Sequence, residues 1–257
     1  MAARIYSLVN QNGGVGKTTS VINLGANLAN LGQKVLIVDL DPQANATSCL
    51  GVDKYSVKSG TYESILGLIN PASALLANTT LGLTLLPSSP ALAGAEVELV
   101  DQNGRESKLK NALMSLVDRY DYILIDCPPS LSLLTINGLI ASQDGVIIPV
   151  QCEYLALEGV GQLMQTIQKV KGISPNLKVR GVIMTMFESR ANLSNDVVSE
   201  IKKFFPEQVF SSIIPRSIRL AEAPSFGLPI TVYAPTSAGA LAYNALAKEL
   251  LAGDASR

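Results

Sequence analysis

Residues 10–19 read Asn-Gln-Asn-Gly-Gly-Val-Gly-Lys-Thr-Thr, and this stretch decides the fold. It follows a short apolar run, Ile5–Val9, and precedes a helical pattern from Lys17 to Leu31. A glycine-rich turn between a strand and a helix lets the backbone close around phosphate groups, and the helix N-terminus adds positive potential there. Lys17 supplies a cation for the phosphates, and Thr18 supplies a hydroxyl for Mg²⁺. The stretch therefore predicts a phosphate-binding loop.

Apolar strand-like runs alternate with helix-like stretches along almost the whole chain. The predicted strands are Ile5–Val9, Val35–Val38, Leu83–Leu86, Tyr122–Ile125, Val146–Val150, Val179–Met184 and Val209–Ile214. The predicted helices are Lys17–Leu31, a weak one at Tyr62–Ile69, Ser107–Arg119, Leu155–Lys171, Asn192–Phe205 and Ser237–Leu251. Short apolar strands separated by helices are typical of a mainly parallel sheet covered on both faces. We expect a three-layer α/β fold that forms a single domain over residues 1–257.

Acidic residues follow two of the predicted strands. Val35–Val38 runs into Asp39 and Asp41, and Tyr122–Ile125 runs into Asp126. The carboxyl ends of parallel strands border the ligand crevice, so these side chains are expected beside the phosphate loop. One of the first pair could hold Mg²⁺ or its waters while the other positions the attacking water, and Asp126 would coordinate the metal through water. The alternative, a pair of solvated turn aspartates, stays open.

Composition excludes several kinds of chemistry. There is no histidine, so a Ser-His-Asp triad, a histidine proton shuttle and a His-ligated metal are ruled out. Three scattered cysteines are too few for a disulfide scaffold and indicate a reducing compartment. No apolar run reaches the roughly 18 residues of a membrane helix, and the first residues enter a strand at once, without room for a signal peptide. A cytoplasmic protein without membrane attachment is expected.

Charge is divided unevenly along the chain. Residues 1–168 carry 9 basic and 14 acidic side chains, whereas residues 169–219 carry 9 basic and 4 acidic ones, a net charge of +5. Such asymmetry can indicate an anionic partner. On this count alone, solvated helix faces explain the basic segment equally well.

Together these residues resemble the ParA/Soj family of deviant Walker-A ATPases, relatives of MinD and of nitrogenase iron protein. The resemblance is carried by Asn10–Thr19, Val38–Thr47, Asp121–Ser130, Pro149–Glu158, Met184–Arg190 and Ile214–Gly227, the last three specific to the partition branch. It implies an ATPase for chromosome or plasmid partition, cytoplasmic and associated with the nucleoid. Mg-ATP would drive a sandwich homodimer that binds double-stranded DNA without sequence preference, and a ParB-like protein would stimulate hydrolysis and release.

The resemblance also implies roles for individual residues. Asp41 and Lys17 would be catalytic, with Asp41 orienting the hydrolytic water. Three residues would serve the metal: Thr18 would ligate Mg²⁺, Asp126 would lie in its outer shell, and Asp39, the strand-end partner of Asp41, would be the third. The nucleotide-binding residues would be Asn12, Gly13, Gly14, Val15, Gly16, Lys17, Thr18, Thr19, Pro215 and Ser217, of which Pro215 and Ser217 flank the adenine. The DNA-binding residues would be Arg190, Arg216 and Arg219, which lie in the basic segment of residues 169–219.

Two positions depart from the family pattern. Asn12 stands where the family has a lysine that reaches the phosphates of the other subunit, like an arginine finger supplied in trans. A neutral, shorter side chain cannot neutralise charge there, so dimerisation and hydrolysis could both be weakened. A natural variant with another basic residue in that role, an engineered substitution and a lineage with altered switching all stay open. Ser217 stands where related proteins often have asparagine.

Three other functions compete with this interpretation. MinD-like membrane cycling needs a basic amphipathic C-terminal helix, whereas residues 238–257 offer only Lys248 and Arg257, with two acidic residues opposing them. An iron–sulfur reductase would have to use Cys127 and Cys152, which no cysteine-rich pattern supports. A scaffold that binds ATP without hydrolysing it is compatible with Asn12, but it would not need Asp41.

Overall fold

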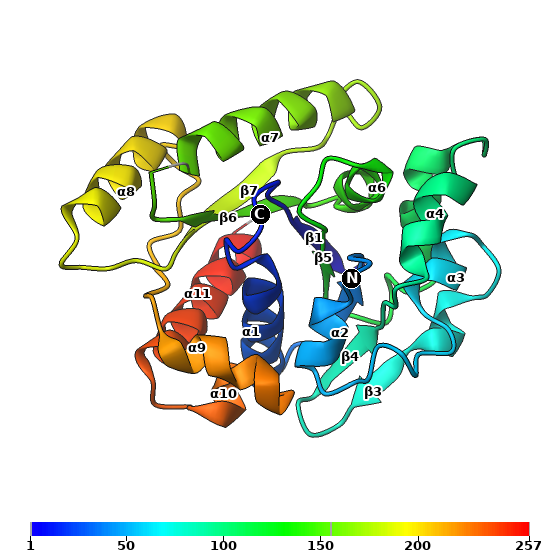
Figure 1. Ribbon diagram of the computed structural model, residues 1–257, viewed down its shortest axis with the longest axis horizontal. Coiled ribbons are helices and arrows are strands. Elements are labelled where there is room, and N and C mark those ends of the chain that lie inside the picture. The colour runs from blue at the N-terminus through cyan, green and yellow to red at the C-terminus, as the bar shows by residue number, and fades with distance from the viewer. Residues whose placement is uncertain (1, 155, 257) are drawn as a thin grey trace.

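The computed structural model describes residues 2–154 and 156–256, and within them one seven-stranded sheet forms the centre of the molecule (Figure 1). Its strand order is β3-β4-β2-β5-β1-β6-β7. All neighbouring pairs are parallel except β3 and β4. The strands are β1 (Arg4–Leu8), β2 (Val35–Asp39), β3 (Leu76–Asn78), β4 (Leu83–Leu86), β5 (Tyr122–Asp126), β6 (Gly145–Gln151) and β7 (Val179–Thr185). The predicted mainly parallel sheet is confirmed.

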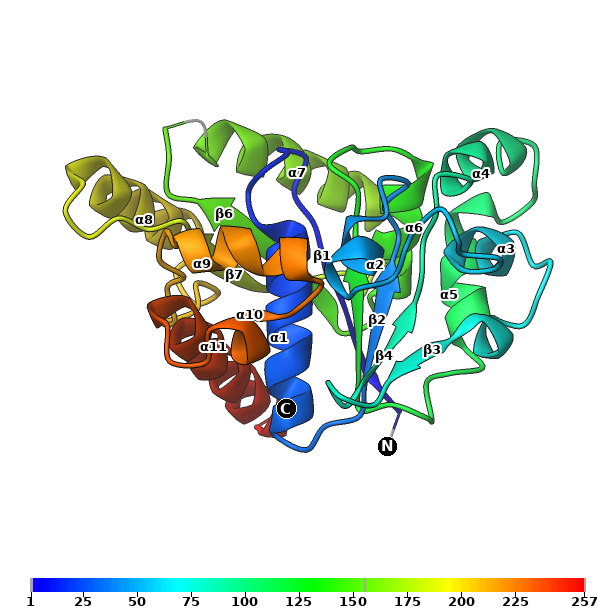
Figure 2. The same cartoon turned by 60° about the horizontal axis from the view of Figure 1, so that its bottom comes forward.

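Helices cover both faces of the sheet (Figures 1 and 2). One face carries α4 (Leu92–Glu98), α5 (Lys108–Leu113), α6 (Leu133–Ala141), α7 (Ala156–Val170) and α8 (Asn192–Phe204). The other carries α1 (Lys17–Asn30), α10 (Ile230–Tyr233) and α11 (Ala238–Ala255). The remaining short helices are α2 (Asn45–Cys49), α3 (Thr61–Ile65) and α9 (Ile218–Glu222).

The period-two alternation of a strand explains the two cores. On β5, Ile123 and Ile125 belong to the hydrophobic cluster under α6 and α7, whereas Tyr122 and Leu124 belong to the cluster under α1 and α11. Because every residue of β5 is buried, the strand reads as a continuous apolar run. The three-layer arrangement follows from this pattern.

Strand register brings the predicted site residues to one edge of the sheet. β5 lies between β1 and β2, and Asp126 at its end pairs in register with Leu8 on one side and Asp39 on the other. The phosphate loop leaves the same end of β1 and opens α1. The crevice expected at the carboxyl ends of the strands is therefore formed by β1, β2 and β5.

Several predicted elements need correction. Val209–Ile214 is not a strand, although it contacts β7 near both of its ends, through an isolated bridge at Val209 and through the Ile214 amide, which donates to the Met184 carbonyl at 2.8 Å. Between these contacts the amides of Ser211 and Ser212 donate instead to the carboxylate of Glu249 on α11, at 2.6 and 2.9 Å. The helix predicted at 107–119 ends after Leu113, and the weak helix at 62–69 is the single turn of α3. The helix predicted from Leu155 is α7, and Leu155 itself lies outside the described residues.

No helix in the described ranges combines the length and the apolar character that crossing a membrane requires.

Candidate nucleotide and magnesium site

The phosphate loop is a wide turn whose backbone conformation favours glycine at two positions. Gly14 and Gly16 have φ angles of 75° and 87°, in the left-handed region that side chains disfavour. The loop is anchored by Thr185 at the end of β7, whose hydroxyl donates to the carbonyl of Val15 at 2.9 Å. Gly13 and Gly14 remain exposed, with open space around their Cα atoms. The sequence-predicted cradle is therefore present and open.

Lys17 is folded back over this loop. Its ammonium group donates to the carbonyl oxygen of Asn12 at 2.8 Å, and the residue is only 7% exposed. Burial lowers the pKa of Lys17, while the nearby carboxyl groups of Asp126 and Asp41 act in the opposite direction. An anionic ligand in the cradle would offset the desolvation of the buried Lys17 ammonium group by adding a further negative charge beside it.

Thr18 and Asp126 form the part of the site that fits a divalent cation. The Thr18 hydroxyl donates to Asp126 Oδ2 at 2.7 Å. The second oxygen, Asp126 Oδ1, is buried and has no hydrogen-bond partner. Burial, followed by the negative charge of Asp39, holds the pKa of Asp126 well above its usual range. A buried carboxylate with a free oxygen next to a hydroxyl is the donor set that Mg²⁺ would use in this position.

The charge balance of the crevice supports the same ligand. Asp39, Asp41 and Asp126 are all buried, and Lys17 is the cation whose charge opposes that of Asp126. In the parts of the chain that the structure describes, no group of three or more acidic, histidine or cysteine side chains is arranged to hold a metal alone. Mg²⁺ commonly takes one or two protein ligands and completes its shell with phosphate oxygens and water.

Asp39 differs from its predicted role as a metal ligand. It is fully buried, and its oxygens accept from the Asp41 amide at 3.2 Å and from the amide and hydroxyl of Thr47 at 2.8 and 2.7 Å. Burial raises the pKa of Asp39 to about 6, against the lowering effect of these donors. With both oxygens engaged by the chain, the geometry does not support direct coordination by Asp39.

Asp41 lies at the rim of the same crevice. It is 6% exposed, and its Oδ1 accepts from the amide of Gln43 at 2.8 Å in a tight turn. The position is on the segment that leaves β2 toward α2, beside the residues that follow β5. The structure therefore brings together Lys17, Thr18, Asp41 and Asp126, as the sequence predicted.

A cavity of about 350 Å³ joins the loop to the predicted adenine residues. Its lining includes Gly16 and Thr19 from the loop and α1, Pro215 and Ser217 from the segment before α9, and Tyr243 from α11. Its remaining lining is largely apolar and includes Ile214, Ile218 and Leu220. A flat aromatic ring such as that of adenine would fit this largely apolar cavity. The Ser217 hydroxyl accepts from the Leu220 amide at 3.4 Å, so it also caps α9.

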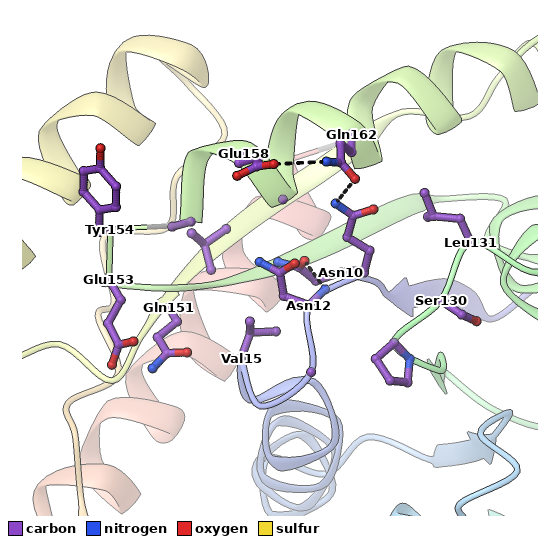
Figure 3. A pocket seen from close by; sticks show the side chains of 16 residues that line it. Asn10, Asn12, Val15, Ser130, Leu131, Gln151, Glu153, Tyr154, Glu158 and Gln162 are labelled. Atoms are coloured by element: carbon purple, nitrogen blue, oxygen red, sulfur yellow. Dashed lines mark hydrogen bonds between the residues drawn. The ribbon is translucent and has the colours of Figure 1, made fainter.

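A second and larger cavity, about 1180 Å³, opens on the other side of the loop, beneath α7 (Figure 3). Asn12 lies at its floor, while Glu158 and Gln162 project from α7 toward the loop. The Gln11 amide donates to Gln162 at 2.7 Å. Sequence reasoning did not single out Gln11, Glu158 or Gln162. Local sequence does not indicate which loop residue a polar side chain on a helix will contact.

The three predicted DNA-contacting arginines are exposed but differ in their surroundings. Arg216 pairs with Glu153 at 2.7 Å and with Glu188 at 2.5 Å. Arg219 pairs with Glu222 at 3.0 Å. Among the described residues, Arg190 forms no salt bridge.

The cysteines do not support an iron–sulfur centre. Cys127 and Cys152 are 1% and 2% exposed and both belong to the core under α6 and α7. Burial raises the pKa of Cys152 to about 12, which leaves its thiol protonated and a poor ligand.

Comparisons with known proteins extend over nearly the whole chain. Residues 3–179 match a family described as an AAA domain. The sporulation initiation inhibitor protein Soj of Bacillus subtilis is 50% identical over 250 residues, covering 97% of this chain and 98% of that protein. The chromosome partitioning protein ParA of Myxococcus xanthus is 51% identical over 253 residues, covering 98% and 89%. A crystal structure of cobyrinic acid a,c-diamide synthase from Mycobacterium smegmatis, with bound ATP analog and magnesium, has a TM-score of 0.87 and 41% identity, covering 99% and 96%.

Proposed function

This chain belongs to the ParA/Soj family of partition ATPases, and we propose that it is a single-domain, ATP-dependent switch for chromosome or plasmid segregation. Mg-ATP binding drives formation of a homodimer that binds double-stranded DNA without sequence preference. Hydrolysis, stimulated by a ParB-like partner, releases the dimer from DNA. The protein works in the cytoplasm, on the nucleoid.

One observation carries the ATPase part of this proposal. Thr18 and Asp126 share a hydrogen bond that leaves one buried carboxylate oxygen open, next to the buried ammonium group of Lys17. That combination is matched to a triphosphate carrying Mg²⁺, because it offers a cation for the phosphates and oxygen donors for the metal. The relative with a bound ATP analog and magnesium supports the same ligands for this chain.

The roles of the chain's own residues follow from their places. The amides of Gly13–Thr19 and the start of α1 would hold the phosphates, and Lys17 would leave the Asn12 carbonyl to contact them. Thr18 and Asp126 would hold Mg²⁺, which draws charge from the phosphate oxygens when bound. Asp41 would orient the attacking water with its carboxylate, and Pro215 and Ser217 would flank the adenine.

The DNA-binding part of the proposal depends on the basic segment, residues 169–219. Arg190 lies before α8, Arg216 and Arg219 lie at α9, and the surrounding segment carries the net charge of +5. Contacts from arginine and lysine to phosphates give binding that is independent of sequence and sensitive to salt. The names of the chromosome-partitioning relatives support DNA as the anionic partner.

Turnover of Mg-ATP tests the proposed function. The protein is incubated with Mg-ATP and sheared duplex DNA, and released phosphate is followed over time beside an Asp41→Ala control. We expect hydrolysis by the natural sequence and a loss of hydrolysis, but not of ATP binding, in the variant. Equal rates in both proteins would refute the enzyme and favour a scaffold that only binds ATP.

A further inference from the structure

A network of buried polar groups lies under the segment that carries Asp41. Asp39 at the end of β2 receives the Asp41 amide on Oδ1 and the amide and hydroxyl of Thr47 on Oδ2. Asp39 and Thr47 are each fully buried. One carboxylate therefore ties together both ends of the loop from residue 41 to residue 47.

Ser88, which follows β4, closes the network from the neighbouring strand. Its amide donates to Thr47 Oγ1 at 2.9 Å, and its hydroxyl donates to the carbonyl oxygen of Asp41 at 2.8 Å. Ser88 is also fully buried. It thus contacts the two residues that Asp39 already joins, Asp41 and Thr47, from the opposite side.

The Thr47 hydroxyl has a fixed direction in this network. It donates its hydrogen to Asp39 and accepts the hydrogen of the Ser88 amide. No water is needed to satisfy either partner, and the low dielectric of the interior strengthens each bond. Removing the hydroxyl would leave a buried amide without an acceptor and deprive the carboxylate of one donor.

The loop that these bonds close is held in a conformation its sequence does not favour. Ala44 has φ 51° and ψ 42°, a left-handed conformation, and it is fully buried. Such a residue persists only where its surroundings over-determine the backbone. The Ala44 amide donates to the Asp41 carbonyl at 2.8 Å, the same oxygen that Ser88 contacts.

We propose that Thr47 and Ser88 are positioning residues for the Asp41 carboxylate: Thr47 acts through the buried carboxylate of Asp39, and the Ser88 hydroxyl acts on the Asp41 carbonyl. This inference rests on the proposed ATPase function. Asp39 then serves as the acceptor that fixes the loop, and the metal site is left to Thr18 and Asp126. Asp41 is held at its amide by Asp39 and at its carbonyl by Ser88, and its Oδ1 also accepts from the Gln43 amide, so the backbone on both sides of the carboxylate is fixed.

Paired substitutions at buried hydroxyls test this inference. Thr47→Val removes the hydroxyl at constant shape, Thr47→Ser restores it, and Ser88→Ala removes the second one. Ser142→Ala is the matched control: Ser142 is buried and donates only to the Leu139 carbonyl, at the end of α6. Single-turnover hydrolysis of Mg-ATP is measured with sheared duplex DNA, with each rate expressed per ATP-binding site counted by titration.

We expect Thr47→Val and Ser88→Ala to lower the rate at saturating ATP by about tenfold or more, since a small displacement of a catalytic group is sufficient for this. The ATP concentration giving half the maximal rate should stay unchanged, because the phosphate loop is untouched. Thr47→Ser should recover most of the rate, and Ser142→Ala should keep it. Should Thr47→Val fail to fold, Ser88→Ala and Thr47→Ser decide the question.

Two results would overturn the inference. Full activity per binding site in Ser88→Ala and in folded Thr47→Val would show that these hydroxyls only stabilise the fold. A parallel loss of ATP binding and rate would show a general disturbance of the site. If the unmodified protein is no faster than Asp41→Ala, the proposed function itself fails and this inference fails with it. If it is faster and the variants match it, only the positioning roles are wrong.

Discussion

The side-chain amide of Asn12 lies so close to Gly159 that a Cβ atom added to the glycine would come 2.5 Å from Asn12 Nδ2. Gly159 is therefore the residue that lets α7 approach the start of the phosphate loop. One helical turn further along α7, the hydrogen bond between the side chains of Gln11 and Gln162 also holds α7 against the phosphate loop. Because the Lys17 ammonium group donates to the Asn12 carbonyl, the packing of α7 and the position of Lys17 are linked.

We predict that Gly159→Ala lowers the affinity for Mg-ATP. The added methyl group would push the Asn12 amide out of its place and disturb the carbonyl on which Lys17 rests. Gly161→Ala is the control, since nothing lies within 4 Å of a Cβ at that position. Alanine in a helix is favoured over glycine by about 1 kcal/mol, so Gly161→Ala should raise the melting temperature and leave binding unchanged. Titration with a fluorescent ATP analogue measures the affinity, and equal affinities in the two variants would contradict the prediction.

Asn12→Lys should strengthen ATP-dependent dimerisation. The large cavity beside Asn12 has room for a longer side chain, and the described residues that line it include Glu153 and Glu158 but no lysine or arginine. A lysine here would supply the cation that the family resemblance places at this position, and it could neutralise phosphate charge where asparagine cannot. Light scattering coupled to gel filtration, with and without Mg-ATP, measures the dimer fraction.

Asn12→Gln provides the control for that experiment, because it lengthens the side chain without adding charge. Should glutamine promote the dimer as strongly as lysine, the effect would come from packing and the charge argument would be wrong.

Arg190→Ala should weaken DNA binding and its dependence on salt. Loss of one phosphate contact lowers the slope of log affinity against log salt by about 0.9. Arg219→Ala should have a smaller effect, because Arg219 already pairs with Glu222 and must give up that contact to reach a phosphate. Lys34→Ala removes the same charge from an exposed position at the start of β2 and serves as the control. Fluorescence anisotropy with labelled duplex DNA over a range of salt gives the slopes, and an unchanged slope for Arg190→Ala would place the DNA surface elsewhere.

The parts of the site that the sequence predicted are those encoded by short, local patterns. The spacing of the glycines before Lys17 and Thr18 predicts a phosphate-binding loop. The acidic residues that follow two apolar strands are expected at the same edge of a parallel sheet. Pro215 and Ser217 were placed beside the adenine by resemblance, and both line one cavity with Gly16 of the phosphate loop.

The parts that the sequence did not predict depend on contacts between distant residues. The Ser88 amide donates to the hydroxyl of Thr47, a residue 41 positions away, and nothing in the local sequence of either residue indicates this contact. The amides of Ser211 and Ser212 donate to Glu249 instead of to a neighbouring strand. Residues 209–214 therefore do not form a strand, although their composition is typical of one. In each case, tertiary hydrogen bonding overrides the local propensity.

The base of the sheet supplies a prediction about alkaline stability. Tyr6 and Tyr122 both donate to the buried carboxylate of Asp254 in the last turn of α11, at 2.9 and 3.0 Å, and Arg180 pairs with the same carboxylate at 2.9 Å. Burial, followed by the charge of Asp254, raises the pKa of both tyrosines. In the unfolded chain they titrate near the ordinary value of about 10.

The sign of the effect follows from linkage. A group whose pKa is raised by folding contributes its full stabilisation below the unfolded pKa and loses it as the pH rises above that value, because the unfolded chain then releases a proton that the folded chain keeps. The free energy of unfolding should therefore fall as the pH rises above about 10. Tyr6→Phe should lower stability near neutral pH but make the alkaline fall shallower, whereas Tyr55→Phe, at a ring that is 80% exposed, should leave the fall unchanged. Urea unfolding at a series of pH values measures both quantities, and an equally steep fall in Tyr6→Phe would show that the Asp254 cluster does not couple to the titration.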